Sequence, residues 1–298
     1  MASESSHAKP PSRAPRLFAL KAPPPERMPI AGCAYRLERV FKHDFYAATC
    51  LYRAEGPARY PRVVVKFSRQ QDLFGLPMGW LASLLADREQ EVYAALAGLD
   101  GVPDWVVRIS PDCYAIEYVD GRPLDHFTKP PPGFFAKLVK LMQAVHERGV
   151  AYGDANKRSN ILVTDDGEPC LVDYQISIRR RDDWPRPLGA LSRRLYEYLC
   201  RKDLYHLYKH KRRICPEELT AEEEALSRKR SGLHWLHRKL TKPYRSLRRR
   251  FLRQQHQSGR LVSPTASLED HHQPEKATWR SPEASDDASD GPAQHGRG

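Results

Sequence analysis

The sequence predicts an α+β fold with two lobes, in which a small β-rich lobe with one main helix precedes a reduced, mostly helical lobe. Runs of β-branched and apolar residues bounded by polar turns are frequent in residues 37–119 and predict strands. Apolar residues at helical spacing are frequent in residues 134–210, interrupted by very short apolar runs at residues 150–173. Without its polar ends the chain keeps about 220 residues, enough for one two-lobed domain with a real core.

Strands and one helix are expected in the N-terminal lobe. A strand-turn-strand is predicted over residues 37–52, and residues 62–67 form a β-branched run that ends in a lysine and a phenylalanine. Residues 114–119 predict a further strand, closed by the turn residues Asp120 and Gly121. Residues 80–99 predict an amphipathic helix with these apolar side chains at helical spacing: Leu81, Leu84, Leu85, Val92, Leu96 and Leu99.

Helices are expected to dominate the second lobe. Residues 134–148 predict a helix that Gly149 ends, because glycine readily adopts the conformation that terminates a helix. Residues 191–210 predict another helix, which contains Asp203. The apolar face of the first helix belongs to the core and consists of Phe135, Leu138, Leu141, Met142 and Val145.

Four polar residues flank the short apolar runs of residues 150–173. Short buried strands hold such side chains rigidly at the rim of a core, which suits a reacting site. Two carboxylates and an amide that face each other across a hairpin form an oxygen cage suited to Mg²⁺ and phosphate. Turn chemistry is the alternative for each residue taken alone, because Asp, Asn and Gly are common in turns. Their order along the chain favours a site: Asp154, Lys157, Asn160 and Asp173.

This arrangement resembles the catalytic and metal-binding loops of the protein-kinase-like superfamily. The resemblance implies a two-lobed kinase-like fold, in which Asp154 orients the acceptor hydroxyl. It also implies that Asn160 and Asp173 hold Mg²⁺, and that Lys157 stabilises charge on the transferred phosphoryl group. The cofactors would then be ATP and Mg²⁺.

Departures from the usual kinase motifs point to an atypical branch of that superfamily. Tyr152-Gly153 precedes the first Asp instead of His-Arg, and Tyr174-Gln175 follows the second Asp instead of Phe-Gly. The Asp-to-Asn spacing is six residues rather than five. The loop is similar to those of bacterial lipopolysaccharide-core sugar kinases and of RIO-like serine/threonine kinases. Asp203 resembles an acid found at this point in the atypical branch, and the resemblance implies that it braces the loop of Asp154.

A nucleotide-binding lobe of this kind needs a lysine and a carboxylate partner. Lys66 stands at the end of its strand, where it resembles the phosphate-binding lysine of kinases. Glu89 resembles the glutamate that pairs with that lysine, and Glu91 is the alternative. For each of these charges, a solvated surface position is the other interpretation.

The same resemblance implies how the rest of the nucleotide is held. The backbone at Glu117, Tyr118 and Val119 would contact the adenine. The strand-turn-strand over residues 37–52 would cover the phosphates, but it contains no glycine, which is the residue that best permits close approach of the backbone. Lys42, His43 and the amides of residues 44–47 would have to serve instead.

The resulting functional hypothesis is an ATP-dependent phosphotransferase, a kinase with an alcohol acceptor. The acceptor is a protein Ser/Thr or the sugar of a membrane glycolipid, and the sequence does not decide between them. A pseudokinase, meaning a nucleotide-binding scaffold without transfer, is the alternative, and the glycine-free phosphate cover motivates it.

The domain organisation follows from composition. Residues 1–28 and 254–298 are poor in apolar side chains and are predicted to be disordered tails. We expect the N-lobe over residues 29–119, the C-lobe over residues 120–225 and a basic amphipathic segment over residues 226–253. No run resembles a secretory signal or a membrane span, so a cytoplasmic location is expected. The six Cys lack paired spacing and predict buried thiols rather than disulfides or a zinc site.

The net charge of +12 is concentrated toward the C-terminus. Residues 233–252 mix Lys and Arg with Leu, Trp and Phe, which suits docking on the C-lobe or peripheral contact with an anionic inner-membrane surface. The same cations could bind nucleic acid, but no nucleic-acid-binding signature supports that partner, and it ranks last.

Overall fold

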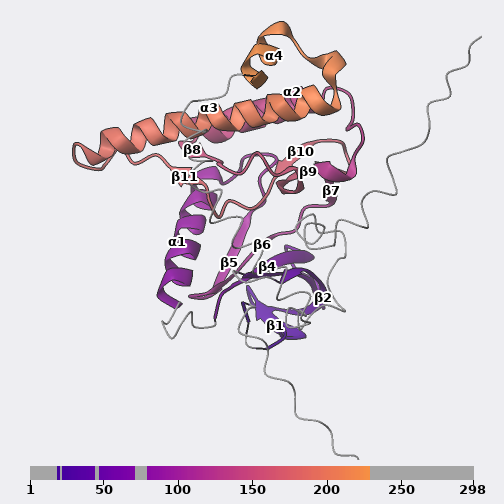
Figure 1. The fold of residues 1–298 in the computed structure, drawn as a ribbon. Helices are drawn as coiled ribbons and strands as arrows, with labels where there is room; N and C mark the ends of the chain where they lie inside the picture. The colour runs from indigo at the N-terminus through magenta and orange to yellow at the C-terminus, as the bar shows by residue number, and fades with distance from the viewer. Residues whose placement is uncertain (1–18, 21, 44–46, 71–78, 229–298) are drawn as a thin grey trace, which may run out of the picture.

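The computed structural model describes residues 19–20, 22–43, 47–70 and 79–228. Figure 1 shows a β-rich lobe joined to a helical lobe, with α1 between them. The α+β, two-lobed architecture expected from the sequence is confirmed. Two residues of the predicted N-terminal tail, Ala19 and Leu20, are buried, and the first strand begins at Arg27. The tail prediction over residues 1–28 therefore extended too far, because a few apolar residues in a polar segment are enough to anchor it.

One six-stranded antiparallel sheet forms the N-lobe, in the order β1-β2-β3-β4-β6-β5. Val63, Val65 and Phe67 of β4 point into the sheet's own core, so Lys66 points to the opposite face. β4 is thus a strand whose side chains alternate between the two faces of the sheet, and this alternation places Lys66 on the face that α1 covers. The strands are β1 (Arg27–Ile30), β2 (Cys33–His43), β3 (Ala47–Ala54), β4 (Arg62–Ser68), β5 (Trp105–Ser110) and β6 (Cys113–Glu117).

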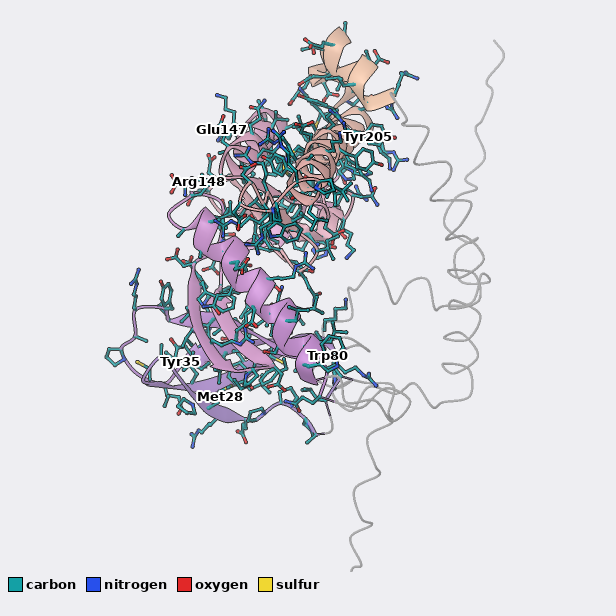
Figure 2. The ribbon with its side chains drawn as sticks, turned by 90° about the vertical axis from the view of Figure 1, so that its left-hand side faces the viewer. Met28, Tyr35, Trp80, Glu147, Arg148 and Tyr205 are labelled. Atoms are coloured by element: carbon teal, nitrogen blue, oxygen red, sulfur yellow. The ribbon has the colours of Figure 1, made fainter. Side chains whose placement is uncertain are left out.

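The helix α1 (Gly79–Leu96) crosses the face of the sheet, and Figure 2 shows it lengthwise with Trp80 at its lower end. It ends three residues before the predicted position because Gly98 takes a φ of 71°. Its buried side includes Val92, Leu96 and the carboxylate of Glu89. The helix therefore brings one acid into the interface with the sheet.

Within residues 120–228, the second lobe consists of three longer helices and short strands. β7 pairs with β9 and β9 with β10, while β8 pairs with β11. One-turn helices lie at Leu124–His126, Arg158–Asn160 and Pro216–Glu218. The main elements are β7 (Gly121–Pro123), α2 (Phe134–Glu147), β8 (Val150–Ala151), β9 (Ile161–Thr164), β10 (Pro169–Leu171), β11 (Ile178–Arg179), α3 (Leu188–Ile214) and α4 (Ala221–Arg228).

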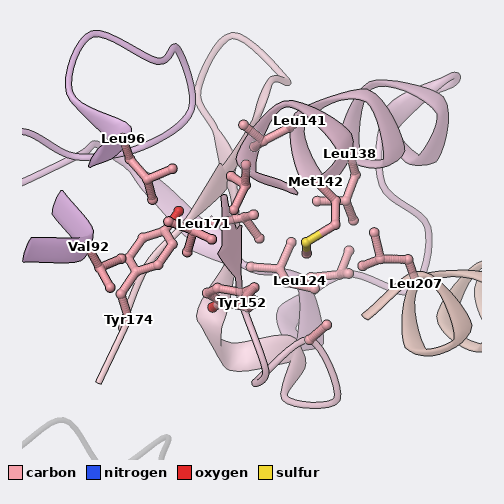
Figure 3. Close-up of a cluster of buried hydrophobic side chains, with 14 of the residues drawn as sticks. Val92, Leu96, Leu124, Leu138, Leu141, Met142, Tyr152, Leu171, Tyr174 and Leu207 are labelled. Carbon is pink, nitrogen blue, oxygen red and sulfur yellow. The ribbon is translucent and has the colours of Figure 1, made fainter. Parts of the chain in front are cut away.

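One hydrophobic cluster is shared by both lobes (Figure 3). Val92 and Leu96 of α1 belong to the same cluster as Leu138 and Met142 of α2 and Leu207 of α3. A second cluster fills the inside of the N-lobe sheet. Because burial of apolar surface is the main stabilising term, the shared cluster fixes one lobe against the other at the hairpin.

The predicted boundary between residues 225 and 226 falls inside α4, whose Ser227 is buried. The C-lobe thus continues at least through Arg228. The basic segment 233–252 and the predicted tail 254–298 lie outside the described residues. The further division of the chain into domains remains a proposal.

All six cysteines are free, and four of them are buried, as expected for thiols that pack like small apolar side chains. Among the described residues, no helix combines the length and apolar character needed to span a bilayer.

Candidate active site

Lys66 lies between two carboxylates at the junction of the lobes. Its Nζ is 2.8 Å from Oε1 of Glu89 and 2.9 Å from Oδ1 of Asp173. Burial alone would lower the pKa of Lys66, but Asp173 and Glu89 outweigh burial and raise it well above its usual value. Burial would likewise raise the pKa of Asp173, but Lys66 lowers it. Lysine and aspartate therefore keep each other charged.

Glu89, and not the alternative Glu91, is the partner of Lys66. The second oxygen of Glu89 accepts a hydrogen bond from the hydroxyl of Tyr114 on β6. Glu91 points in another direction and pairs with Arg181. Two positions apart on a helix, the two acids differ by about 200° in direction, so only one of them can face the sheet.

Asp154 lies at the turn that follows β8. Its Oδ2 accepts a hydrogen bond from Nδ2 of Asn160 at 2.9 Å and is 2.8 Å from Nζ of Lys157. Burial raises the pKa of Asp154, while the hydrogen bond and charge of Lys157 oppose this effect. Asp154 and Asn160 are both 8% exposed, so the two side chains are held in one orientation.

Tyr152 ties the loop of Asp154 to the loop of Asp173. Its hydroxyl donates to the carbonyl oxygens of Val172 at 2.6 Å and of Asn160 at 3.2 Å. The amide of Val172 also donates to the carbonyl of Asn160 at 3.0 Å. Asp173 directly follows Val172, so these hydrogen bonds hold the loop of Asp173 against the loop of Asn160. In the sequence, Tyr152 stands out only because Tyr152-Gly153 replaces the His-Arg that usually precedes the first Asp of the kinase motif.

Asp173 takes a φ of 65°, a left-handed conformation that is uncommon for a residue with a side chain. Such conformations cost about 1–3 kcal/mol and persist where the surroundings enforce them, often at functional sites. Here the ion pair with Lys66 and the packing of the next residue enforce it. Tyr174 is buried, with its ring 5.2 Å from those of Tyr93 and Tyr152 in edge-on contacts.

The oxygen donors present fit Mg²⁺. Asp173 supplies a carboxylate whose pKa is lowered, and its side chain is 35% exposed, so it can accept a ligand. Asn160 supplies an amide oxygen from the neighbouring loop. Mg²⁺ usually takes one or two such groups and completes its shell with water and nucleotide phosphates, so this sparse set is sufficient.

The predicted adenine-contact residues follow β6. The amide of Glu117 donates to the carbonyl of Asp104 at 2.8 Å, and the amide of Tyr118 donates to the carbonyl of Arg62 at 3.3 Å. The ring of Tyr118 also stacks on Phe41, with centroids 6.2 Å apart. Val119 is the remaining predicted member of this group.

The predicted phosphate cover is described only in its flanking strands, since residues 44–46 lie outside the described residues. Lys42 at the end of β2 is one of the charges that lower the pKa of Asp173, so it lies toward the site. His43 is buried, and its Nε2 accepts a hydrogen bond from the amide of Leu20 at 3.3 Å. Of the two side chains, Lys42 is the better placed to meet phosphate.

Asp203 of α3 braces the loop before Asp154. Its two oxygens accept hydrogen bonds from the amides of Tyr152 and Gly153, both at 2.9 Å. His146 of α2 lies 3.3 Å away, and its pKa, which burial alone would lower, is raised to about 9 by hydrogen bonds with Asp203 and Cys200. The bracing role expected of Asp203 is present in the structure.

His210 of α3 is a further residue beside the loop of Asp154, and no motif in the sequence pointed to it. Its Nε2 lies 3.0 Å from the carbonyl of Ala155, directly after Asp154, and burial lowers its pKa to about 4. A neutral ring therefore donates to that carbonyl at ordinary pH. His210 lies seven residues after Asp203 and therefore on the same face of the helix, and this spacing is the sequence feature from which its position near the loop could have been predicted.

Comparison with known proteins yields structural neighbours only. No family model matches the sequence, and no curated protein matches it. A crystal structure of the Rio2 kinase from Chaetomium thermophilum is similar, with 18% identity and a TM-score of 0.46 over 60% of this chain. The ADP/Mg²⁺-phosphoaspartate complex of the same kinase gives 17% identity and a TM-score of 0.47 over 62% of this chain. The alignments span 57% of the Rio2 chain in both cases.

The order of the elements and the ion pair between Lys66 and Glu89 agree with the two-lobed α+β architecture and the lysine–glutamate pairing expected from the sequence.

Proposed function

We propose that this protein is an ATP-dependent phosphotransferase. The observation that carries the proposal is the convergence of Lys66, Glu89 and Asp173 from β4, α1 and the loop after β10. A lone ammonium held between two acids is poised to exchange one carboxylate contact for a phosphate, while the buried Glu89 keeps it oriented. Phosphoryl transfer depends mainly on such positioning and on charge neutralisation.

Each residue near the nucleotide would have one task. Lys66 would bind phosphate oxygens, and Lys42 would add charge above them. Asp173 and Asn160 would hold Mg²⁺, which supplies neutralisation of phosphate charge when bound. The amides of Glu117 and Tyr118 are occupied within the sheet, so Val119 is the candidate amide donor to adenine.

Asp154 would orient the acceptor hydroxyl and accept its proton as the phosphoryl group is transferred. Its burial and raised pKa make it a better proton acceptor than an exposed aspartate. Lys157 is 2.8 Å from the same oxygen and is half-exposed, so it can move its charge toward the transferred group. Asn160 keeps the carboxylate aimed by its hydrogen bond.

Two acceptor classes remain as proposals, a protein Ser/Thr and a glycolipid sugar, and both suit a cytoplasmic or peripheral membrane location. The resemblance of the Asp154 loop to lipopolysaccharide-core sugar kinases favours the sugar, the resemblance to serine/threonine kinases favours the protein, and the sequence does not decide between them. A direct test incubates the full chain with γ-labelled ATP, Mg²⁺ and panels of glycolipid and protein acceptors. Transfer of label to one class identifies it.

The decisive variants are Asp154→Asn and Asp173→Asn. Asp154→Asn should reduce transfer by about 10³-fold while nucleotide affinity is kept, since one proton acceptor is worth about 10²–10⁴. Asp173→Asn should abolish the Mg²⁺-dependent part of nucleotide binding. The control is Asp166→Asn, in the turn after β9, which should match the wild type in both assays.

A nucleotide-binding pseudokinase is the second candidate, and the absence of glycine from residues 37–52 favours it. That candidate predicts tight binding of ATP with neither hydrolysis nor transfer to any acceptor. Undetectable ATP binding by the wild-type chain would contradict both candidates.

A further inference from the structure

Exposed apolar side chains gather where the chain passes from β11 into α3. Trp184 is 48% exposed, and Leu188, Leu191 and Leu195 are 51%, 64% and 43% exposed. The three leucines are spaced by three and four residues, so they form one stripe along the helix. We call Trp184 and these three leucines the α3 apolar stripe.

The stripe lies on a part of α3 that extends past the rest of the lobe. Figure 1 shows the N-terminal end of α3 reaching beyond β8 and β11 to the edge of the molecule. The buried residues of α3 begin at Tyr196, and those that follow, such as Asp203 and Leu207, face the shared core. A single exposed leucine needs no explanation, but a contiguous stripe on a projecting helix indicates an interaction surface.

The charge around the stripe is strongly positive. Residues 176–195 contain six arginines and two aspartates, which gives a net charge of +4 (6 − 2). Arg180 and Arg193 pair with Asp182, and Arg181 pairs with Glu91. Within the described part of the chain, no ion pair engages the other three arginines: Arg179, Arg186 and Arg194.

The same segment is continuous with the candidate active site. β11 pairs with β8, the strand that leads into the turn of Asp154. The hydroxyl of Ser177 donates to the carbonyl of Tyr152 at 2.8 Å, and Ile176 beside it is 55% exposed. The segment that leads into the stripe is therefore fixed by hydrogen bonds to the strand that precedes Asp154.

We propose that the α3 apolar stripe and its arginines dock the protein on an anionic lipid bilayer. Leucine and tryptophan insert into the acyl boundary, and exposed arginines beside them are attracted to negatively charged headgroups. A partner protein would match the leucines equally well, but the uncompensated arginines specify a negative surface. This surface is separate from residues 233–252, and the docking does not require the phosphotransferase activity.

The test is sedimentation of the full chain with sucrose-loaded vesicles. Vesicles of phosphatidylglycerol and phosphatidylcholine should bind the wild type at least tenfold better than phosphatidylcholine alone, and 0.5 M salt should weaken binding. Leu191→Glu and Trp184→Ser should each reduce binding to the anionic vesicles several-fold. The matched controls are Leu84→Glu and Trp80→Ser on α1, which alter side chains of similar exposure and should leave binding unchanged.

Circular dichroism melting curves would establish that each variant is folded. Asp154→Asn should bind vesicles like the wild type, so loss of lipid binding and loss of transfer are measured separately. Wild-type vesicle affinity in both α3 variants, with loss only on deletion of residues 233–252, would overturn the proposal. Lipid-independent self-association that Leu191→Glu abolishes would overturn it as well, in favour of contact between two copies of the chain.

Discussion

Lys66 illustrates how single residues here depend on partners from distant parts of the chain. Its ammonium is buried, and burial of an isolated charge is costly unless another charge compensates for it. Glu89 lies 23 residues later and Asp173 lies 107 residues later in the sequence. The conformation of one side chain therefore reports whether both lobes are assembled.

Glu89→Gln should lower the rate of phosphoryl transfer by about 10–100-fold, because neutral glutamine orients Lys66 less firmly. The effect should appear in kcat more than in nucleotide affinity, since the ammonium of Lys66 remains available to bind phosphate. Glu91→Gln is the control and removes only the contact with Arg181. Equal rates for the two variants in a single-turnover assay would exclude the role given to Glu89.

Tyr152→Phe should lower the free energy of unfolding by about 1–2 kcal/mol, because two buried carbonyls lose a donor. It should also weaken Mg²⁺-dependent nucleotide binding by loosening the contact between the two loops. Tyr35→Phe removes a comparable buried hydroxyl, which donates to Tyr60 at 2.6 Å in the N-lobe. That control should lose similar stability in urea titrations and keep its nucleotide affinity; weakened binding in both variants would point to a general effect.

At the scale of elements, α3 holds the loop of Asp154 in place through Asp203 and His210. Asp203 holds two amides before Asp154, and His210 holds one carbonyl after it. Asp203 and His210 are seven residues apart and therefore lie on the same face of α3. The helix thus fixes the turn of Asp154 on both sides. The opposite pKa shifts of His146 and His210 make this support measurable by pH.

The pair of His146 and Asp203 should stabilise the fold most near pH 6, because burial raises the pKa of Asp203 and protonation of that carboxylate at lower pH removes the pair. The pKa of His146 is raised from 6.5 to about 9, so its contribution is complete below pH 6.5 and is lost as pH rises through 9. The rise of this pKa from 6.5 to about 9 corresponds to roughly 3 kcal/mol of stability. Urea unfolding of His146→Gln should therefore differ from the wild type at pH 6 and converge toward it at pH 10.

His210→Gln provides the opposite dependence. The pKa of His210 is lowered from 6.5 to about 4, so its neutral ring stabilises the fold above pH 6.5 and loses that contribution as pH falls through 4. The difference between this variant and the wild type should shrink from pH 7 to pH 4. The same pH trend in both histidine variants would contradict these assignments.

At the scale of the whole molecule, the shared core makes the two lobes one cooperative unit. Leu96 of α1 and Leu138 of α2 belong to one cluster and are 1% and 0% exposed. Packed cores transmit the loss of one element to its neighbours. The site at the junction of the lobes is consequently as stable as the core beneath it.

Leu138→Ala should destabilise both lobes together by about 2–5 kcal/mol, because it leaves a cavity in the shared cluster. Hydrogen exchange measured by mass spectrometry in moderate urea should show α1 and α2 losing protection by the same amount. Leu191→Ala, on the exposed stripe, is the control and should change the stability little. Loss of protection in α2 alone would indicate two independently folding lobes.

The sequence by itself indicated the main elements of the fold and a candidate set of site residues. β-branched runs, helical spacing and the terminating Gly149 located β4, α1, α2 and β9, because local propensity and pattern decide these features within a few residues. The order of Asp154, Asn160 and Asp173 indicated an oxygen site on a hairpin. Each of these inferences concerns residues close together in the chain.

Tertiary structure alone decided the contacts between distant residues. It selected Glu89 over Glu91, placed Tyr152 between the two loops and extended α3 by three residues before Leu191 into a projecting stripe. Patterns along a chain report which residues are buried, but not which buried residues meet. The directions of the side chains, and the ion pairs between residues distant in the chain, are set only when the two lobes pack together.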